Sequence, residues 1–344
     1  MDFQDVEAAA LPLDFDVSFI PSGSSANILD FDFSSGISSL GSLATMLDTS
    51  QSEEDQMALE RALYRVAKPF SPAHIAPFAR SRIEYSIEQL KAVPKMMIEH
   101  NGTPWAHSRL YEEDMPRSLQ DAHAACALYI AKNEANAEHV TRFITNRVEE
   151  LITTALPDAP VELLARAQAL MLYQIMLVFG GDVRCYAHAE ALIPHLGEAG
   201  NALLVTAAQQ TDITGSLPLY PSTAARAAWR SYVFRESLRR TLLSLFQMTA
   251  MCDLLRGQLK SCVHSLLYGN RVTLSAHLWH AKNSFDFAVA WNDKKHFLVK
   301  ELDFTEVLRD AQPDDVDIFA RMMMVGLQGI DDIRGWFYTR GGTL

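Results

Sequence analysis

Two residue pairs have the spacing of metal ligands. Cys185 and His188 are three residues apart, and so are His277 and His280, so each pair can present two ligands on one face of a helix. A zinc site needs four protein ligands, or three and a water molecule, and no further pair with matching spacing accompanies these two. Buried thiols and core histidines explain such pairs more often. We therefore expect no metal site.

The signatures of nucleophilic and phosphate chemistry are missing from the sequence. It has no G-x-S-x-G motif and no Walker loop, and Gly180-Gly181 is followed by Asp182, whose charge would repel phosphate. Adjacent carboxylates occur at Glu149–Glu150, Asp314–Asp315 and Asp331–Asp332. Neighbours on a helix point in different directions, so these pairs indicate solvated faces or helix caps. We predict that the protein is not an enzyme.

Glu236, Arg239 and Arg240 form the polar cluster with the clearest pattern. Glu236 and Arg240 are four residues apart, so they can meet on one face of a helix. Functionally, the cluster could hold an anionic effector. Structurally, it could be an ion-pair network that ties its helix to the neighbouring helices, and we favour this interpretation because Glu236 already offers a partner.

This cluster lies in the segment 229–255, around which the rest of the chain is organised. The segment contains no Pro or Gly, and its second half, 241–252, has no charged residue. A helix that is apolar on all sides must be covered by other helices. We predict that 229–255, starting near 222, is the central helix of an all-α, multi-helix domain of packed helical hairpins.

Apolar periodicity and caps predict the other elements. Helices are expected at 53–67, 80–93, 118–132, 138–156, 161–179, 182–195, 202–209, 261–268, 275–291, 303–310 and 313–337. Gly180-Gly181 and Asp182 predict a hairpin between two of them, because glycine suits a helix end and Asp a helix start. Strand signals are almost absent, and 299–302 is at most a fragment.

The N-terminal segment differs in composition from the remainder. Residues 1–60 contain twelve Asp and Glu and no Lys or Arg, which leaves 30 acidic and 30 basic residues in 61–344. Up to residue 33, acids alternate with bulky apolar residues, which is typical of disordered segments that bind partner proteins. We predict a disordered acidic tail and linker over 1–60, with protein contacts at Phe15, Phe19, Phe31 and Phe33. A passive leader and a strand are the alternatives.

Charge and hydropathy exclude other classes. The part after residue 60 is formally neutral and its longest basic run is a pair, which argues against direct nucleic-acid binding. No charged start precedes an apolar block, so no secretory signal is expected. The longest uncharged apolar stretch, 167–181, is too short to span a bilayer comfortably. Four cysteines suit a reducing compartment. We expect an intracellular protein without a membrane segment.

Several segments resemble the fungal-specific regulatory domain, or middle homology region, of zinc-cluster (C6) transcription factors and their C2H2-finger relatives. They are 103–111 (TPWAHSRLY), 115–129 (MPRSLQDAHAACALY), 163–182 (LLARAQALMLYQIMLVFGGD), 229–246 (WRSYVFRESLRRTLLSLF) and 303–337. The likeness covers 68–340 and rests on the order of the segments; Tyr232 stands where a second Trp is expected. It implies an all-α regulatory domain, a nuclear location and a role in RNA polymerase II transcription.

One departure from that family changes the expectation. The zinc cluster that binds DNA in those factors needs six closely spaced cysteines, whereas this chain has four, the first at Cys126. We therefore expect no zinc cofactor and no direct DNA binding. Either an upstream exon encoding the DNA-binding part has been lost, or the chain is a stand-alone regulator.

In both cases the expected partners are coactivators or a DNA-binding partner protein, with room for a small-molecule effector. The alternatives are an enzyme or ligand-binding protein of a biosynthetic cluster built on the same helices, and a degenerate scaffold without activity.

Overall fold

The computed structural model describes residues 77–256 and 270–344. The predicted tail and linker, its four phenylalanines, and the helices expected at 53–67 and 261–268 lie outside the described residues. The first half contains α3 (Pro77–His100), α4 (Arg117–Ile130), α5 (Ala137–Thr153), α6 (Pro160–Phe179), η2 (Val183–Cys185), α7 (Tyr186–Ala208) and α8 (Thr223–Leu255).

The second half has shorter elements. They are β1 (Arg271–Thr273), α10 (Ala276–Trp279), α11 (Ser284–Asp293), β2 (Leu298–Lys300), α12 (Thr305–Asp310), η3 (Pro313–Asp315), α13 (Ile318–Gln328) and α14 (Ile330–Thr339). β1 and β2 form an antiparallel pair in which Val272 faces Val299. In the described part these are the only named strands, so the prediction of an all-α architecture is confirmed.

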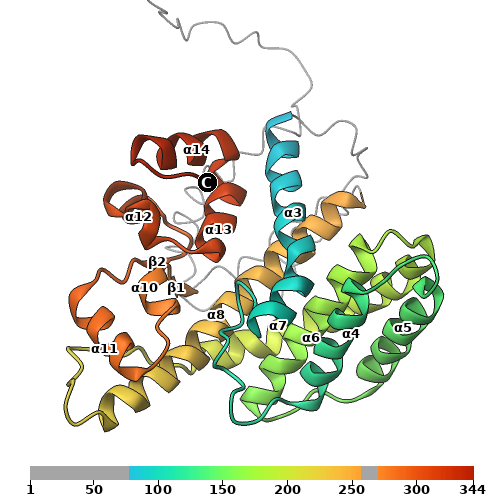
Figure 1. Ribbon diagram of the computed structural model, residues 1–344, viewed down its shortest axis with the longest axis horizontal. Helices are drawn as coiled ribbons and strands as arrows, with labels where there is room; N and C mark the ends of the chain where they lie inside the picture. Colours follow the sequence, from blue (N-terminus) through green and yellow to red (C-terminus); the bar gives the residue numbers. More distant parts are fainter. Residues whose placement is uncertain (1–76, 257–269) are drawn as a thin grey trace, which may run out of the picture.

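Helix α8 is the central helix, as predicted. It crosses the molecule between α4–α7 on one side and the C-terminal elements on the other (Figure 1). Leu238 belongs to the hydrophobic core formed with α3–α7. Leu243 belongs to a core of the C-terminal segment, residues 270–344, and Tyr232 to a third core around Phe287. Because α8 contributes side chains to each of the three cores, it holds the three cores in fixed positions relative to one another.

The most buried part of α8 differs from the expectation. The uncharged stretch 241–252 was expected to be the interior part, with the charged residues beside it. In the structure every residue from 235 to 245 is buried, including Arg235, Glu236, Arg239 and Arg240. Charged groups are rarely buried unless they are paired, and here carboxylates from other segments supply the partners.

Helix α6 is the most hydrophobic helix of the described residues. Every residue from 163 to 177 is buried. By length and composition alone this helix is apolar enough to cross a membrane, contrary to the expectation from the sequence, but 83% of its most apolar window is buried inside the protein. It packs against α4, α7 and α8, so its hydrophobicity is that of a core helix.

Several helix ends differ from the prediction. Asp182 caps η2 by accepting a hydrogen bond from the Arg184 backbone, as expected for the hairpin after α6. Helix α7 then continues through Pro194 and well beyond 195, to Ala208, and includes the short helix expected at 202–209. Its glycines do not end it: at Gly200 an added Cβ would lie 3.2 Å from Leu245, so the small residue permits close packing on α8.

Two long predicted helices are each divided. The helix expected at 275–291 becomes α10 and α11, because Asn283 caps a new start by accepting from the Phe285 and Asp286 backbones. The helix expected at 313–337 becomes η3, α13 and α14, with a break at Gly329, whose φ of 105° only glycine adopts readily. In α3, conversely, Pro94 lies inside the helix and does not end it.

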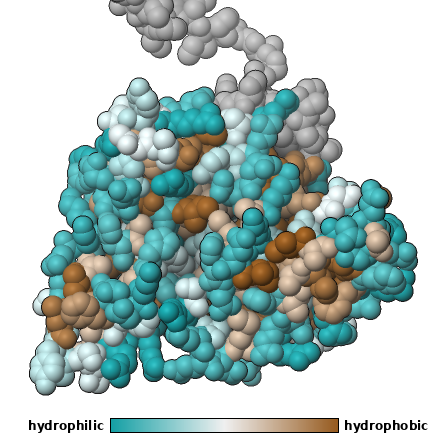
Figure 2. Space-filling view, in the orientation of Figure 1, coloured by the Kyte–Doolittle hydropathy of each residue, from teal (hydrophilic) through white to brown (hydrophobic). Residues whose placement is uncertain are grey.

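The surface seen in Figure 2 is mostly hydrophilic, and its hydrophobic residues form separate patches. Single exposed apolar residues, such as Val183 and Tyr338, are normal on globular proteins and need no partner.

Candidate functional site

Arg240 lies at the centre of a buried ion-pair network. Its Nη1 donates to Asp317 Oδ2, and its Nε lies 3.4 Å from Glu236 Oε1. Nη2 donates to the backbone oxygen of Thr273 at 2.9 Å. The guanidinium carbon lies 3.8 Å from the centre of the Trp279 ring, within the range of a cation–π contact. The network thus joins α8 to β1, α10 and the start of α13.

Electrostatics keep Arg240 charged in this interior position. Burial alone would lower its pKa, but Asp317 and Glu236 outweigh that effect and hold the pKa above its ordinary value. For Glu236, burial raises the pKa, and the nearby Arg240 and Arg239 oppose the rise. Glu236 Oε1 also accepts from the Thr273 backbone at 2.8 Å. Two carboxylates therefore face one guanidinium.

Arg239 belongs to a second network, although the sequence placed it with Glu236 and Arg240. Its Nη1 lies 2.7 Å from Asp212 Oδ1 in the α7–α8 connection. Arg235 Nε lies 3.4 Å from the same oxygen, and Arg271 Nε lies 2.9 Å from Asp212 Oδ2. The sequence predicted neither Asp212 nor Asp317 as a partner. Asp317 lies near the start of the helix predicted at 313–337, while nothing in the neighbouring sequence marks Asp212.

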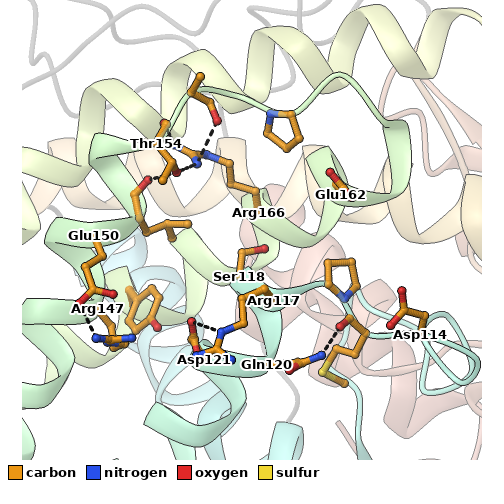
Figure 3. A pocket seen from close by; sticks show the side chains of 16 residues that line it. Asp114, Arg117, Ser118, Gln120, Asp121, Arg147, Glu150, Thr154, Glu162 and Arg166 are labelled. Carbon is orange, nitrogen blue, oxygen red and sulfur yellow. Dashed lines mark hydrogen bonds and ion pairs between the residues drawn. The ribbon is translucent and has the colours of Figure 1, made fainter.

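A cleft of about 530 Å³ lies among α4, α5, α6 and the segment before α4. Figure 3 shows its polar lining, which includes Arg117, Arg147, Arg166, Asp121 and Glu150. Among the described residues, the lining contains no histidine and no cysteine, the side chains that most often serve as nucleophile–base pairs. It was not predicted from the sequence, because its residues come from separate helices.

The arginines of this cleft are already engaged. Arg117 Nε donates to Asp121 at 3.0 Å, Arg147 pairs with Glu150, and Arg166 Nη2 donates to the Thr154 backbone oxygen at 2.8 Å (Figure 3). These contacts join neighbouring turns and helices. Most of the positive charge in the cleft therefore already has a partner within the protein.

Tyr173 lies at the inner side of the cleft. Its hydroxyl is buried and has no hydrogen-bond partner among residues 77–256 and 270–344, and burial raises the pKa of Tyr173. A neutral tyrosine hydroxyl can donate to or accept from a bound polar group.

The candidate metal ligands are not assembled into a site. His188 Nε2 lies 3.2 Å from Glu149, and His277 Nε2 lies 3.2 Å from Asp315. The partners Cys185 and His280 make no third ligand with them, and over 77–256 and 270–344 no three His, Cys, Asp or Glu side chains are grouped as a metal ion would require.

The chain is similar to a fungal transcription factor. Transcription factor gsfR2 of Penicillium aethiopicum is 28% identical over 261 residues, which are 75% of this chain and 62% of the relative. The chain therefore spans less than two thirds of that relative's length. No family model matches the sequence, and no solved structure matches it.

Proposed function

We propose that this chain is the regulatory part of a fungal transcription regulator, working in the nucleus through contacts with other proteins and without binding DNA itself. The observation that carries the proposal is the similarity to transcription factor gsfR2 over 75% of the chain. That stretch is long enough to include most of the described helices. The order of segments that resembles the regulatory domain of zinc-cluster factors supports the same role.

The distribution of charge supports action through proteins. Residues 61–344 carry equal numbers of acidic and basic residues, whereas DNA-binding surfaces depend on clustered Lys and Arg that displace counterions. The cysteines are too few for a six-cysteine zinc cluster. Under this proposal, DNA is contacted by a partner protein, and coactivators are contacted by the acidic, phenylalanine-containing segment.

A tethering experiment tests the coactivator contact. The full chain is fused to a heterologous DNA-binding domain, and transcription of a reporter is measured. We expect activation that falls at least about fivefold when Phe15, Phe19, Phe31 and Phe33 are changed to Ala, because aromatic side chains supply contact energy. The matched control changes Ser34, Ser35, Ser38 and Ser39 to Ala in the same segment. An inactive fusion, or equal activity of both variants, would rule out the coactivator contact.

A DNA-binding assay tests the other half of the proposal. Electrophoretic mobility of promoter fragments is measured with the purified chain, over a range of salt concentrations. We expect no shift at physiological salt. Tight, sequence-selective binding that weakens steeply with salt would show direct phosphate contacts and would overturn the proposal.

A second candidate is a ligand-binding protein or an enzyme built on the same helices. The cleft beside Arg166 and Tyr173 favours it, because its volume is in the range of small-molecule sites. A thermal-shift screen with polar metabolites distinguishes the candidates. A metabolite that stabilises the wild-type chain and loses that effect in Tyr173→Phe would support this second function.

A further inference from the structure

The two arginine networks differ in how their charges are balanced. Arg240 faces two carboxylates, whereas Asp212 faces three guanidinium groups, those of Arg235, Arg239 and Arg271. Even when both networks are counted together, four arginines face the three carboxylates of Asp212, Glu236 and Asp317. Among the described residues at least one positive charge is therefore left over, and the excess lies on the Asp212 side.

Burial makes this excess costly. The side chains of Arg235 and Arg239 are each only 3% exposed, and a buried charge is unfavourable unless it is fully paired and hydrogen-bonded. Arg235 Nη1 donates to the Thr211 backbone oxygen at 2.9 Å, but its Nε is buried and makes no hydrogen bond with the described part of the chain. Burial and the neighbouring Arg239 lower the pKa of Arg235. An additional negative group would stabilise this network.

The network is open to solvent on one side. The side chains of Arg271 and Asp212 are 39% and 26% exposed, and they lie on β1 and on the α7–α8 connection. The described structure assigns Arg271 one ion pair, through Nε, so its two Nη groups remain for a further acceptor. A guanidinium fork matches the oxygens of a carboxylate or phosphate in both spacing and plane.

We propose that the Asp212 network is a binding site for an oxyanion, a phosphate or carboxylate group carried by a small molecule. The anion would be held by Arg271 at the mouth and by Arg239 behind it. Only one of the three arginines is well exposed, so the site suits a compact group. A nucleic-acid backbone, which contacts several surface cations in a row, does not fit it.

Binding would act on the junction between the two halves of the molecule. Arg235 and Arg239 lie on α8, Asp212 lies before it, and Arg271 lies on β1, which pairs with β2 of the C-terminal segment. An anion that joins these elements would stabilise the C-terminal segment against α8. This inference does not depend on the proposed role in transcription, because it concerns binding to the isolated chain.

Titration of the full chain with inorganic phosphate tests the site. Thermal unfolding is followed with potassium phosphate, with sodium succinate, and with sodium chloride at the same ionic strength; calorimetry gives the affinities. We expect phosphate or succinate to raise Tm by roughly 2 °C or more above the chloride value. The more effective of the two identifies the preferred group. Equal effects of all three salts would overturn the proposal.

Two variants should change the rise of Tm with phosphate in opposite directions. Arg271→Gln should weaken anion binding at least about tenfold, because a charge-assisted fork is lost at the mouth. Asp212→Asn should lower Tm without anion, since the sole carboxylate is removed, and should then show a larger rise with phosphate than the wild type. A purely structural pairing predicts a loss in Asp212→Asn that phosphate does not restore.

Arg142→Gln is the matched control. It makes the same change of charge at an exposed arginine of α5 that pairs with Glu138 and lines neither site, so it should leave the anion response unchanged. An unaltered response in Arg271→Gln, or an equal loss in Arg142→Gln, would overturn the site. Should Asp212→Asn fail to fold, the wild type, Arg271→Gln and Arg142→Gln still decide the question.

Discussion

Asp317 uses its two carboxylate oxygens for different partners: Oδ1 accepts from the Ala320 backbone at 2.9 Å and caps α13, while Oδ2 accepts from Arg240 of α8. Arg240 is 77 residues away in the chain. Both side chains are almost completely buried, at 0% and 1% exposure. The start of one helix is thus bonded to the middle of another, and this link fixes the C-terminal segment on the central helix.

Asp317→Asn separates the two roles of this residue. Asparagine retains an acceptor for the helix cap but leaves Arg240 with only one carboxylate in the interior. Breaking a buried ion pair at one partner typically costs about 3–5 kcal/mol. We therefore expect a clear fall in the midpoint of urea unfolding. The control is Glu113→Gln, at an exposed pair with Arg230, which should cost less than about 1 kcal/mol. Equal midpoints for the two variants would contradict the role of the link.

Arg240→Lys tests whether shape matters besides charge. The planar guanidinium contacts the Trp279 ring, donates to the Thr273 backbone, and reaches Asp317. Lysine keeps the charge but cannot make these contacts together. A loss of about 2–3 kcal/mol in unfolding free energy is expected from urea titration. The control is Arg230→Lys, at an exposed pair with Glu113, which should change stability by less than about 0.5 kcal/mol. A similarly small loss in Arg240→Lys would show that the charge of Arg240 stabilises the fold and the shape of its guanidinium does not.

The sequence predicted the helical architecture and α8 because those signals are local. An uninterrupted run of good helix formers and an uncharged stretch indicate a buried helix without knowledge of its neighbours. Helix ends were predicted less well, because tertiary packing decides them. Pro94 lies inside α3, although the predicted helix ended before it, and Gly200 lies inside α7 and packs on Leu245, between two helices that were predicted to be separate.

The same distinction applies to the arginine networks. The pairing of Glu236 with Arg240 follows from their spacing of four residues and could be predicted. The partners Asp212 and Asp317 come from other segments, and no periodicity in α8 points to them. Hence the sequence placed Arg239 and Arg240 in one cluster, whereas the fold pairs Arg239 with Asp212 and Arg240 with Asp317, in networks of different charge balance.

The cysteines of the described part should be unreactive while the protein is folded. Cys126, Cys185 and Cys252 are buried, and burial raises the pKa of Cys126 to about 12. Because the thiolate is the reactive form, Ellman's reagent at pH 8 should detect none of these three thiols in a folded Cys262→Ser variant. In urea all three should react. A rapid reaction of one thiol in the native state would show that its helix opens locally.

His107 should make the fold sensitive to mild acid. Burial, followed by the charge of Arg240, lowers its pKa to about 4 from an ordinary value of 6.5. Between these two values the unfolded chain binds more protons than the folded one, so stability falls as the pH is lowered from 6.5 towards 4. The expected total for this residue is on the order of 3 kcal/mol.

The slope of stability against pH is the measurement that isolates this effect. His107 Nδ1 accepts from the Arg109 backbone at 3.0 Å, and in His107→Asn the amide oxygen can take over that bond. The variant will be less stable at every pH because the contact with Trp279 is lost. Its urea midpoint should nevertheless fall less steeply between pH 6.5 and 4. The control is His139→Asn, at an exposed position, which should keep the wild-type slope. If His107→Asn keeps that slope as well, protonation of His107 is not the cause of the loss of stability in acid.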